Sequence, residues 1–490
     1  MANSKRKVSR CMSTQHPDNV NSPFFSDSEI LAGETEIKET YYVFSHLGIM
    51  EQMWDCEGKE VDNHVVEKLL SRYPKFFSEN KLGRDFYLTL RVPNPAIERA
   101  QGKILLETLE SIPRNYDIAA ASGEKIAPIW EVILPMCTSS NELERIYDYY
   151  RKVVVGKKTT RVGDMSVQEW LGDFSPSEIS LIPLVEDRAS LSGADKIVGG
   201  FIEGKKFSQQ RVFLARSDPA LNYGSLAAVL LNKLCLQKLH ALEEKTSVEI
   251  LPIIGVGSAP FRGNLKPTNV QNCLKEYPSV QTFTLQSSYK YDYPESVVRK
   301  GTEEISEAKR RHPLHVEEGA VNAIVDKTIA EYQKEVSLLS PLITTLSKYN
   351  PSRRARKLHI GLFGYSRSMK GLSLPRAIPF CSALYSIGVP PELLGLSALT
   401  EKELDSVRNM YVSFDEDMSD STKYLCRENL KRLPNGVGTR LAALVQGFDS
   451  KEDAEYSEAA KEVMDIALSD NRANLTEAIM KTAWKRNFLG

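Results

Sequence analysis

Short apolar runs alternate with longer amphipathic segments along most of this 490-residue chain. The runs are rich in β-branched and aromatic residues, and several are almost entirely apolar, as strands buried on both faces should be. This alternation is typical of βα units and predicts a parallel sheet. Eight such runs predict a closed (β/α)8 barrel of the TIM type, with additional helices packed on it. The predicted strands are residues 49–54, 86–90, 126–134, 179–185, 212–215, 248–254, 280–285 and 358–363.

The segments around the predicted barrel divide the chain into three parts of one compact unit. Residues 1–48 are expected to form a polar arm without helical or strand period, followed by a helix over 29–47 with Ser28 as its cap. Residues 49–372 are assigned to the barrel. Residues 373–490 are expected to be a helical layer packed on it, because no low-complexity linker separates them. The other predicted helices are residues 141–155, 223–245, 316–348 with a break near Pro341, 375–387, 400–411, 421–433, 437–446 and 455–468.

The composition is that of a globular protein with little net charge. Hydrophobic residues make up 42% of the chain and charged residues 26%, and the formal net charge is −1. Any anion site must therefore be a local cluster, and no nucleic-acid partner is expected. Seven cysteines are scattered without a CxxC pair, which fits a reducing compartment. With no signal peptide and no run near the roughly 18 apolar residues of a membrane span, we expect a cytoplasmic protein without a membrane partner.

Two carboxylates follow neighbouring predicted strands. Glu186 comes directly after the run 179–185, and Asp218 lies shortly after the run 212–215. Parallel neighbouring strands would place both acids at the same end of the sheet. Two hard oxygen ligands so placed suit Mg²⁺ or Mn²⁺, which keeps water or substrate at its other positions. Two solvated acids at strand ends are the alternative interpretation.

Arginines follow other predicted strands, and a histidine lies in the N-terminal arm. The planar guanidinium matches carboxylate and phosphate geometry, so several arginines on one rim would bind a small, highly charged anion. For a single arginine, a surface salt bridge is the simpler interpretation. His16 is presented from an extended segment because Pro17 disfavours α geometry before it, although such a histidine is often only an exposed side chain. The arginines at strand ends are Arg91, Arg262, Arg367 and Arg376.

Five motifs are similar to those of one enzyme family. STQHPDN, MWDCEGKEVD, LARSDPALNYG, GSAPFRGN and FGYSRSMKGLSLPRAIPF together resemble the archaeal-type phosphoenolpyruvate carboxylases. The resemblance runs from Met12 to the C-terminus. It implies an anaplerotic carboxy-lyase that converts phosphoenolpyruvate and bicarbonate to oxaloacetate and phosphate, through carboxyphosphate and a metal-bound enolate. It further implies Mg²⁺ or Mn²⁺ as cofactor, no biotin, and a homo-oligomer, since the family tends to form tetramers.

The resemblance also implies roles for individual residues. His16 falls on the family's catalytic histidine, which assists carboxyphosphate breakdown and carboxylation. Glu186 and Asp218 fall on its metal ligands. The substrate-binding arginines that it implies are Arg91, Arg262, Arg367 and Arg376, with Arg262 also catalytic.

Some positions depart from the pattern of the longer enzymes of this family. An arginine of their glycine-rich loop is Val256 here, the histidine before it is Ile254, and a nearby lysine is Leu221. One or two cations around the phosphate must therefore come from elsewhere, and Arg216 and Arg188 are the candidates. Whether aspartate, malate or acetyl-CoA regulates the protein stays open.

Two other functions stay open on the residues alone. The first is a metal-dependent C–C lyase of the citrate-lyase or aldolase type working through a pyruvate-like enolate, which would use the same acid pair but would not need so many arginines. The second is a non-catalytic nucleic-acid binder using the basic runs KRRHPLH (309–315) and PSRRARK (351–357).

Overall fold

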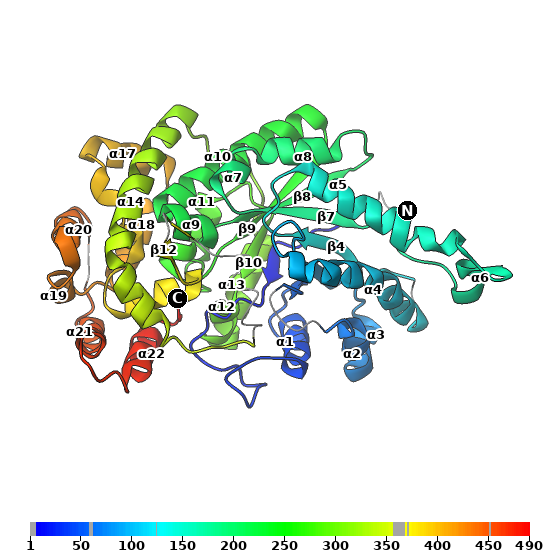
Figure 1. The fold of residues 1–490 in the computed structure, drawn as a ribbon, viewed down its shortest axis with the longest axis horizontal. Helices are drawn as coiled ribbons and strands as arrows, with labels where there is room; N and C mark the ends of the chain where they lie inside the picture. Colours follow the sequence, from blue (N-terminus) through cyan, green and yellow to red (C-terminus); the bar gives the residue numbers. More distant parts are fainter. Residues whose placement is uncertain (1–5, 58–61, 124, 356–367, 370–371, 450–451) are drawn as a thin grey trace.

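Eight parallel strands close into a barrel in the computed structural model, which describes residues 6–57, 62–123, 125–355, 368–369, 372–449 and 452–490 (Figure 1). Each strand pairs with the next strand of the barrel along the chain, and β10 pairs with β1. The barrel strands are β1 (Cys11–Ser13), β2 (Glu51–Asp55), β3 (Tyr87–Arg91), β4 (Ile129–Leu134), β7 (Ser180–Val185), β8 (Gln209–Ala215), β9 (Glu249–Gly255) and β10 (Thr282–Leu285). The strands β5 (Arg161–Val162) and β6 (Met165–Ser166) form a separate hairpin, and β11 (Ser368–Met369) pairs with β12 (Leu372–Ser373).

The N-terminal arm supplies a barrel strand, contrary to the expectation that it has no strand. In β1, Cys11 pairs with Phe283 of β10 and Met12 pairs with Glu51 of β2. Three residues are too few to show a period of two, and two neighbouring strands, not the local sequence, supply the hydrogen-bonding partners. Seven of the eight predicted strands are present within a few residues. The predicted strand 358–363 lies outside the described residues, and β1 closes the barrel.

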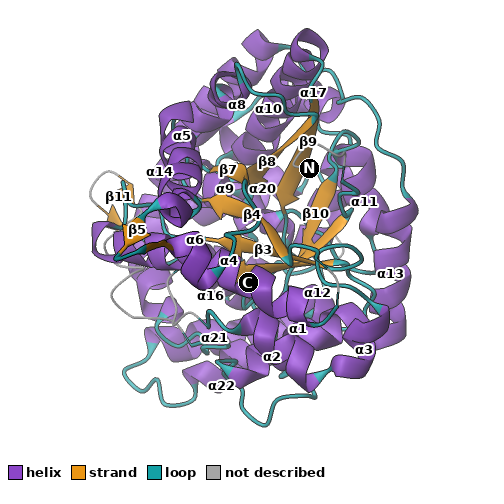
Figure 2. Ribbon diagram, turned by 90° about the vertical axis from the view of Figure 1, so that its right-hand side faces the viewer, coloured by secondary structure: helices purple, strands orange, loops and turns teal. Residues whose placement is uncertain are grey.

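Helices surround the barrel strands on the outside (Figure 2). Helix α14 lies within the predicted span 316–348 but runs through Pro341 without the predicted break. Pro341 cannot donate to the carbonyl of Ser337, and Ser340 Oγ donates to that oxygen instead, at 2.8 Å. The helices up to this point are α1 (Glu34–Ser45), α2 (Val65–Arg72), α3 (Pro74–Glu79), α4 (Gly102–Ala121), α5 (Ser140–Tyr149), α6 (Val167–Leu171), α7 (Arg188–Ser192), α8 (Ala194–Ile202), α9 (Ser217–Tyr223), α10 (Ser225–Thr246), α11 (Val270–Glu276), α12 (Ser287–Tyr291), α13 (Glu295–Glu307) and α14 (Glu318–Ser347).

Helix α1 begins later than predicted. The residue before it is Gly33 with φ of 52°, a left-handed conformation that ends any helix arriving from Ser28. Leu31, two residues before Gly33, forms a β-bridge with Arg354 instead. The arm is therefore tied to the segment that leads out of α14.

The remaining helices gather on one side of the barrel, next to α14 (Figure 1). The predicted helix 421–433 is two pieces, the end of α18 and the short α19, and α22 is absent from the predicted helices. Phe488 and Leu489 are fully buried, so the last residues of the sequence pack against the rest of the protein. Among the described residues, no single helix is both long and apolar enough to cross a membrane. These helices are α16 (Ala377–Ser386), α17 (Glu401–Met410), α18 (Phe414–Thr422), α19 (Arg427–Leu430), α20 (Val437–Val445), α21 (Ala454–Leu468) and α22 (Leu475–Arg486).

A buried ionic cluster lies inside the barrel toward the amino ends of the strands. Arg211 of β8 donates to Glu51 of β2 and Glu131 of β4, each at 2.7 Å, and to Thr282 of β10 at 3.2 Å. Burial alone would lower the pKa of Arg211, but the two carboxylates outweigh it and raise that pKa. The cluster links four strands from within, while apolar side chains from β1, β2, β4, β7, β8 and β9 form a separate core cluster.

Replacing Arg211 by Met should lower the free energy of unfolding by about 3–5 kcal/mol, because the buried Glu51 and the partly buried Glu131 both lose their ion pair with it. Urea denaturation measures the change. Arg310→Met is the matched control, since its ion pair with Glu243 is partly exposed and should be worth less than about 1 kcal/mol. Equal effects of the two substitutions would contradict the stabilising role of the inner cluster.

Candidate active site

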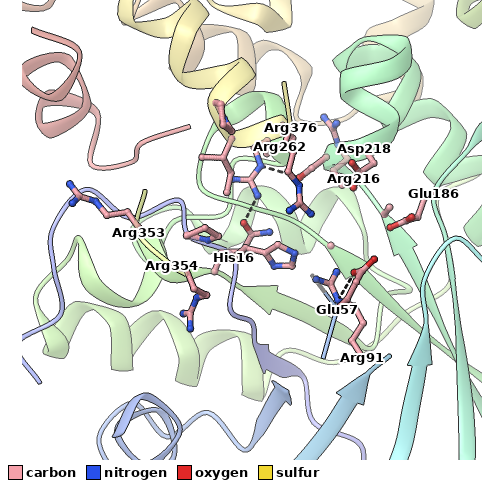
Figure 3. A pocket seen from close by; sticks show the side chains of 18 of the residues that line it. His16, Glu57, Arg91, Glu186, Arg216, Asp218, Arg262, Arg353, Arg354 and Arg376 are labelled. Carbon is pink, nitrogen blue, oxygen red and sulfur yellow. Dashed lines mark hydrogen bonds and ion pairs between the residues drawn. The ribbon is translucent and has the colours of Figure 1, made fainter. Parts of the chain in front are cut away.

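A cavity of about 300 Å³ lies at the carboxyl ends of the barrel strands (Figure 3). Its walls come from the segments that follow β1, β2, β7, β8, β9 and β10, from the end of β3, from residues 350–354 after α14, and from the start of α16. Six of the seven site residues predicted from the sequence line it, and Arg367 lies outside the described residues. The charged or titratable side chains in its walls are His16, Glu57, Arg91, Glu186, Arg216, Asp218, Arg262, Arg353, Arg354 and Arg376.

The two carboxylates come from adjacent strands. Glu186 directly follows β7, and Asp218 lies in the first turn of α9 just after β8. Because Val185 of β7 pairs with Leu214 of β8, both strands end at the same level. Both acids are half-buried and line the same cavity (Figure 3). This donor set fits a hard divalent cation such as Mg²⁺ or Mn²⁺, which takes carboxylate oxygens and retains several other positions for water or substrate.

Arg262 is held in one orientation from several directions. Its Nε donates to Ser217 Oγ at 3.1 Å, its Nη1 donates to Asp18 Oδ2 at 3.2 Å and to the carbonyl oxygen of Gly490 at 2.7 Å, and its Nη2 donates to Gln286. The side chain is buried. Four of the five guanidinium N–H groups thus have acceptors, and no acceptor for the fifth is found among the residues that the structure describes.

Two partners of Arg262 come from segments at opposite ends of the chain, and the sequence offered no signal for them. Burial raises the pKa of the Asp18 carboxyl, and the charge of Arg262 opposes that shift. Gly490 approaches α16 so closely that a Cβ would lie 2.1 Å from the carbonyl oxygen of Ile378. The residue at this position must therefore be glycine if its carbonyl is to reach Arg262.

Arg91, at the end of β3, is paired with two carboxylates. Its Nε and Nη2 donate to both oxygens of Asp55, at 3.0 and 2.6 Å, and Nε lies 3.3 Å from Glu57. Burial would lower the pKa of Arg91, but Asp55 and then Glu57 raise it. Nearby, burial and the charge of Glu57 raise the pKa of Glu98 to about 7. Two acids thus offset the charge of Arg91 in this part of the cavity.

His16 lies three residues after β1, and its half-buried ring points into the cavity (Figure 3). The backbone around it is fixed, because the carbonyl of His16 accepts from the N–H groups of Asp18 and Ser287, at 3.1 and 3.2 Å. Its Nδ1 lies 2.9 Å from Thr14 Oγ1. The barrel wall, and not a loose arm, therefore presents this histidine.

The two arginines proposed as replacement cations are engaged elsewhere. Arg216 is buried, and its guanidinium donates to the carbonyl of Phe261 at 3.1 Å and to Ser225 Oγ at 2.9 Å. Arg188 does not line the cavity and pairs with Asp326 at 2.6 Å on the outside. Arg216 can add charge to the cavity wall, but its hydrogen bonds point to the protein.

The basic run 351–357 is not an exposed patch in its described part. Arg353 and Arg354 are both buried and line the cavity. Arg353 pairs with Glu29, and Arg354 pairs with Glu36 and Glu39 of α1. The interpretation of this run as a nucleic-acid surface is therefore wrong for residues 351–355, and the acids that explain the two arginines lie far away in the sequence.

Comparisons with known proteins agree on one family. A family model described as phosphoenolpyruvate carboxylase matches residues 8–490. Relatives with that name are 50% identical in Methanothermobacter thermautotrophicus and in Pyrococcus abyssi, each covering 99% of this chain and 100% of the relative. A relative with the same name in Halobacterium salinarum is 44% identical, with 99% of both chains covered. A solved structure titled as a citrate lyase, from Burkholderia xenovorans, matches 68% of this chain at 8% identity with a TM-score of 0.36, too low to bear on function.

Proposed function

Because the chain belongs to the archaeal-type phosphoenolpyruvate carboxylase family, we propose that the cavity at the carboxyl end of its barrel is where phosphoenolpyruvate and bicarbonate become oxaloacetate and phosphate. The observation that supports this most is the meeting of two carboxylates, several arginines and one histidine in one cavity of a size suited to a small anion. The assignments below give roles in that reaction to the two carboxylates, the histidine and some of the arginines.

Glu186 and Asp218 would hold the divalent cation, Mg²⁺ or Mn²⁺. They are adjacent in the cavity wall, and carboxylate oxygens are the ligands that such ions prefer. When bound, the ion supplies positive charge that offsets negative charge developing on substrate oxygens. The two acids would thereby set the position of the cation relative to the arginines.

Arg262 is assigned to binding the phosphoryl group of the substrate. Arg376, which also lines the cavity, is assigned to substrate binding. Arg262 is rigid because Ser217, Asp18 and Gly490 hold it. A rigid donor needs no rearrangement when charge moves onto the departing phosphate, which is the condition for strong transition-state stabilisation. We also assign Arg367 to substrate binding, on the resemblance of its motif alone.

His16 is assigned to the steps after phosphoryl transfer. Attack of a bicarbonate oxygen on phosphorus breaks the bond to the enol oxygen and gives carboxyphosphate and the enolate of pyruvate. Because Nδ1 is engaged by Thr14, we assign Nε2 of His16 to accept the carboxyl proton of carboxyphosphate as its C–O bond breaks to give CO₂ and phosphate. The enolate carbon then adds to CO₂ to give oxaloacetate.

Replacing Arg262 by Lys should lower kcat/KM for phosphoenolpyruvate about 100-fold or more, because an ammonium cannot keep these anchors and still reach the phosphate. Steady-state kinetics at saturating bicarbonate measure the change. Arg188→Lys is the control, since Arg188 does not line the cavity, and it should stay within about twofold of the unmodified protein. Unchanged kinetics in the Arg262 variant would remove this arginine from the reaction.

We also propose that the enzyme works as a cytoplasmic homotetramer, without biotin and without a nucleic-acid or membrane partner. The family resemblance supports the tetramer and the absence of biotin. The near-neutral charge supports the absence of a nucleic-acid partner. Light scattering of the purified protein measures the number of subunits, and a monomer at micromolar concentration would contradict the proposed state.

The experiment that tests the function counts both products. Phosphate release from phosphoenolpyruvate with Mg²⁺ is measured with and without bicarbonate, and malate dehydrogenase reports oxaloacetate in the same sample. One phosphate for each oxaloacetate, only with bicarbonate, is expected. No phosphate from folded protein with Mg²⁺ present would overturn the proposal and favour a C–C lyase using the same acid pair.

A further inference from the structure

A group of buried charges behind β1 has no role in the reaction as assigned above. Lys290, Glu39 and Arg354 are each almost completely buried. Glu39 accepts from Lys290 Nζ at 3.0 Å and from Arg354 Nη2 at 2.9 Å, and Arg354 Nη1 also donates to Glu36 at 2.8 Å. Two cations face two anions, so the group has no net charge with which to attract a substrate.

This group is strongly held together. Burial would raise the pKa of the Glu39 carboxyl, but Arg354 and Lys290 lower it well below its usual range. Tyr291 also donates to Glu39, at 2.6 Å. A buried ion network in which every member has good partners is rigid, and removing one member is costly. The side chains of this network therefore hold fixed positions, and they can hold a neighbouring segment in place.

The network contacts Ser13, the last residue of β1, and Thr14, which follows it. Besides its bond to Glu39, Lys290 Nζ donates to Ser13 Oγ and to the carbonyl oxygen of Thr14, each at 3.0 Å. The N–H of Thr14 donates to the carbonyl of Leu285 in the neighbouring strand, also at 3.0 Å. The backbone of Thr14 is thus fixed on both sides, and its buried side chain has a defined direction.

That direction is toward the imidazole of His16. Thr14 Oγ1 lies 2.9 Å from His16 Nδ1, and no other hydrogen bond of this hydroxyl is recorded among the described residues. We infer that Thr14 is a positioning residue for His16: its hydroxyl fixes the rotation of the imidazole and so directs Nε2 into the cavity. The inference rests on the role proposed for His16.

The physical reason is the freedom of the ring. The Cβ–Cγ torsion of histidine is broad and roughly two-fold, so a hydrogen bond to Nδ1 restricts the rotation of the ring and favours one nitrogen toward the cavity. A displacement of about 1 Å at a reacting atom can cost about 100-fold in rate. Phosphoryl transfer is assigned to other groups, so loss of the hydroxyl should affect the carboxylation half of the reaction more than phosphate release.

Thr14→Val and Thr14→Ser test this directly. Valine has nearly the shape of threonine without the hydroxyl, and serine restores the hydroxyl. Phosphate, oxaloacetate and pyruvate are counted in the same samples, with Mg²⁺, phosphoenolpyruvate and bicarbonate. Thr14→Val should keep phosphate release within about threefold of the unmodified protein, while the ratio of oxaloacetate to phosphate falls about fivefold or more. Thr14→Ser should keep the ratio within about twofold of one.

A merely structural role for Thr14 gives a different result, because both products then fall together and their ratio stays at one. An unchanged ratio in Thr14→Val, or a failure of Thr14→Ser to restore it, would overturn the inference. His16→Asn in the same assay separates this failure from failure of the proposed function. If His16→Asn uncouples the products but Thr14→Val does not, only the positioning role is wrong. If His16→Asn also gives equal products, the role proposed for His16 is wrong.

Discussion

Replacement of Glu186 by Gln is expected to abolish carboxylation, with kcat/KM falling about 1,000-fold or more. The carboxamide has nearly the same shape but no charge, so that of the two proposed ligands Asp218 alone keeps its negative charge. Phosphate release should be lost together with oxaloacetate formation, because the cation is needed for phosphoryl transfer, which precedes carboxylation. Asp218→Asn should behave in the same way.

The decisive measurement is binding of the cation itself. Titration with Mn²⁺, followed by electron paramagnetic resonance, should show a site in the unmodified protein that is at least about tenfold weaker in Glu186→Gln. Glu203→Gln is the matched control, since Glu203 is exposed and does not line the cavity. Unmodified affinity for Mn²⁺ in Glu186→Gln would show that this residue is not a ligand, even if activity were lost.

His16→Ala is expected to uncouple the two halves of the reaction instead of abolishing both. Bicarbonate-dependent phosphate release should remain within about tenfold of the unmodified protein, whereas oxaloacetate formation should fall about 100-fold or more. The enolate that no longer meets CO₂ is protonated, so pyruvate should appear in its place. Parallel assays of phosphate, oxaloacetate and pyruvate measure this partition.

The control for this prediction is another histidine. His64 is exposed, pairs with Glu67 and does not line the cavity, so His64→Ala should keep one oxaloacetate for each phosphate. Oxaloacetate formation at the unmodified rate in His16→Ala would refute the assigned role. Loss of phosphate release equal to the loss of oxaloacetate would place His16 in phosphoryl transfer instead.

The barrel could be predicted because its longer strands are locally distinct. Residues such as those of β7 and β9 are almost all apolar, and amphipathic segments separate them, so each carries its own signal. Strand β1 has no such signal, since three residues are too short to show a period. Its pairing with β10 and β2 is decided by tertiary contacts that only the folded chain contains.

The same contrast holds in the cavity. Glu186 and Asp218 could be located because the end of a parallel strand is a place that the sequence can specify. Arg262 could be located too, but not its partners Asp18 and Gly490, which come from opposite ends of the chain. The interpretation of Arg354 as part of a nucleic-acid surface is wrong for the same reason, because nothing near it in the sequence points to its partners Glu36 and Glu39. The place of a site residue at the end of a strand follows from the local sequence pattern, whereas its hydrogen-bond and ion-pair partners depend on contacts between distant segments.

The pairing of β1 with β10 also has a consequence for how the chain is made. Cys11 leaves the ribosome long before its partner Phe283 is made. At roughly 5–20 residues per second, one edge of β1 waits on the order of tens of seconds for its neighbour. A nascent chain released before β10 is complete would carry His16 next to an open edge of β1, and such an edge favours pairing with other chains. The histidine is thus among the first site residues synthesised and among the last to be placed.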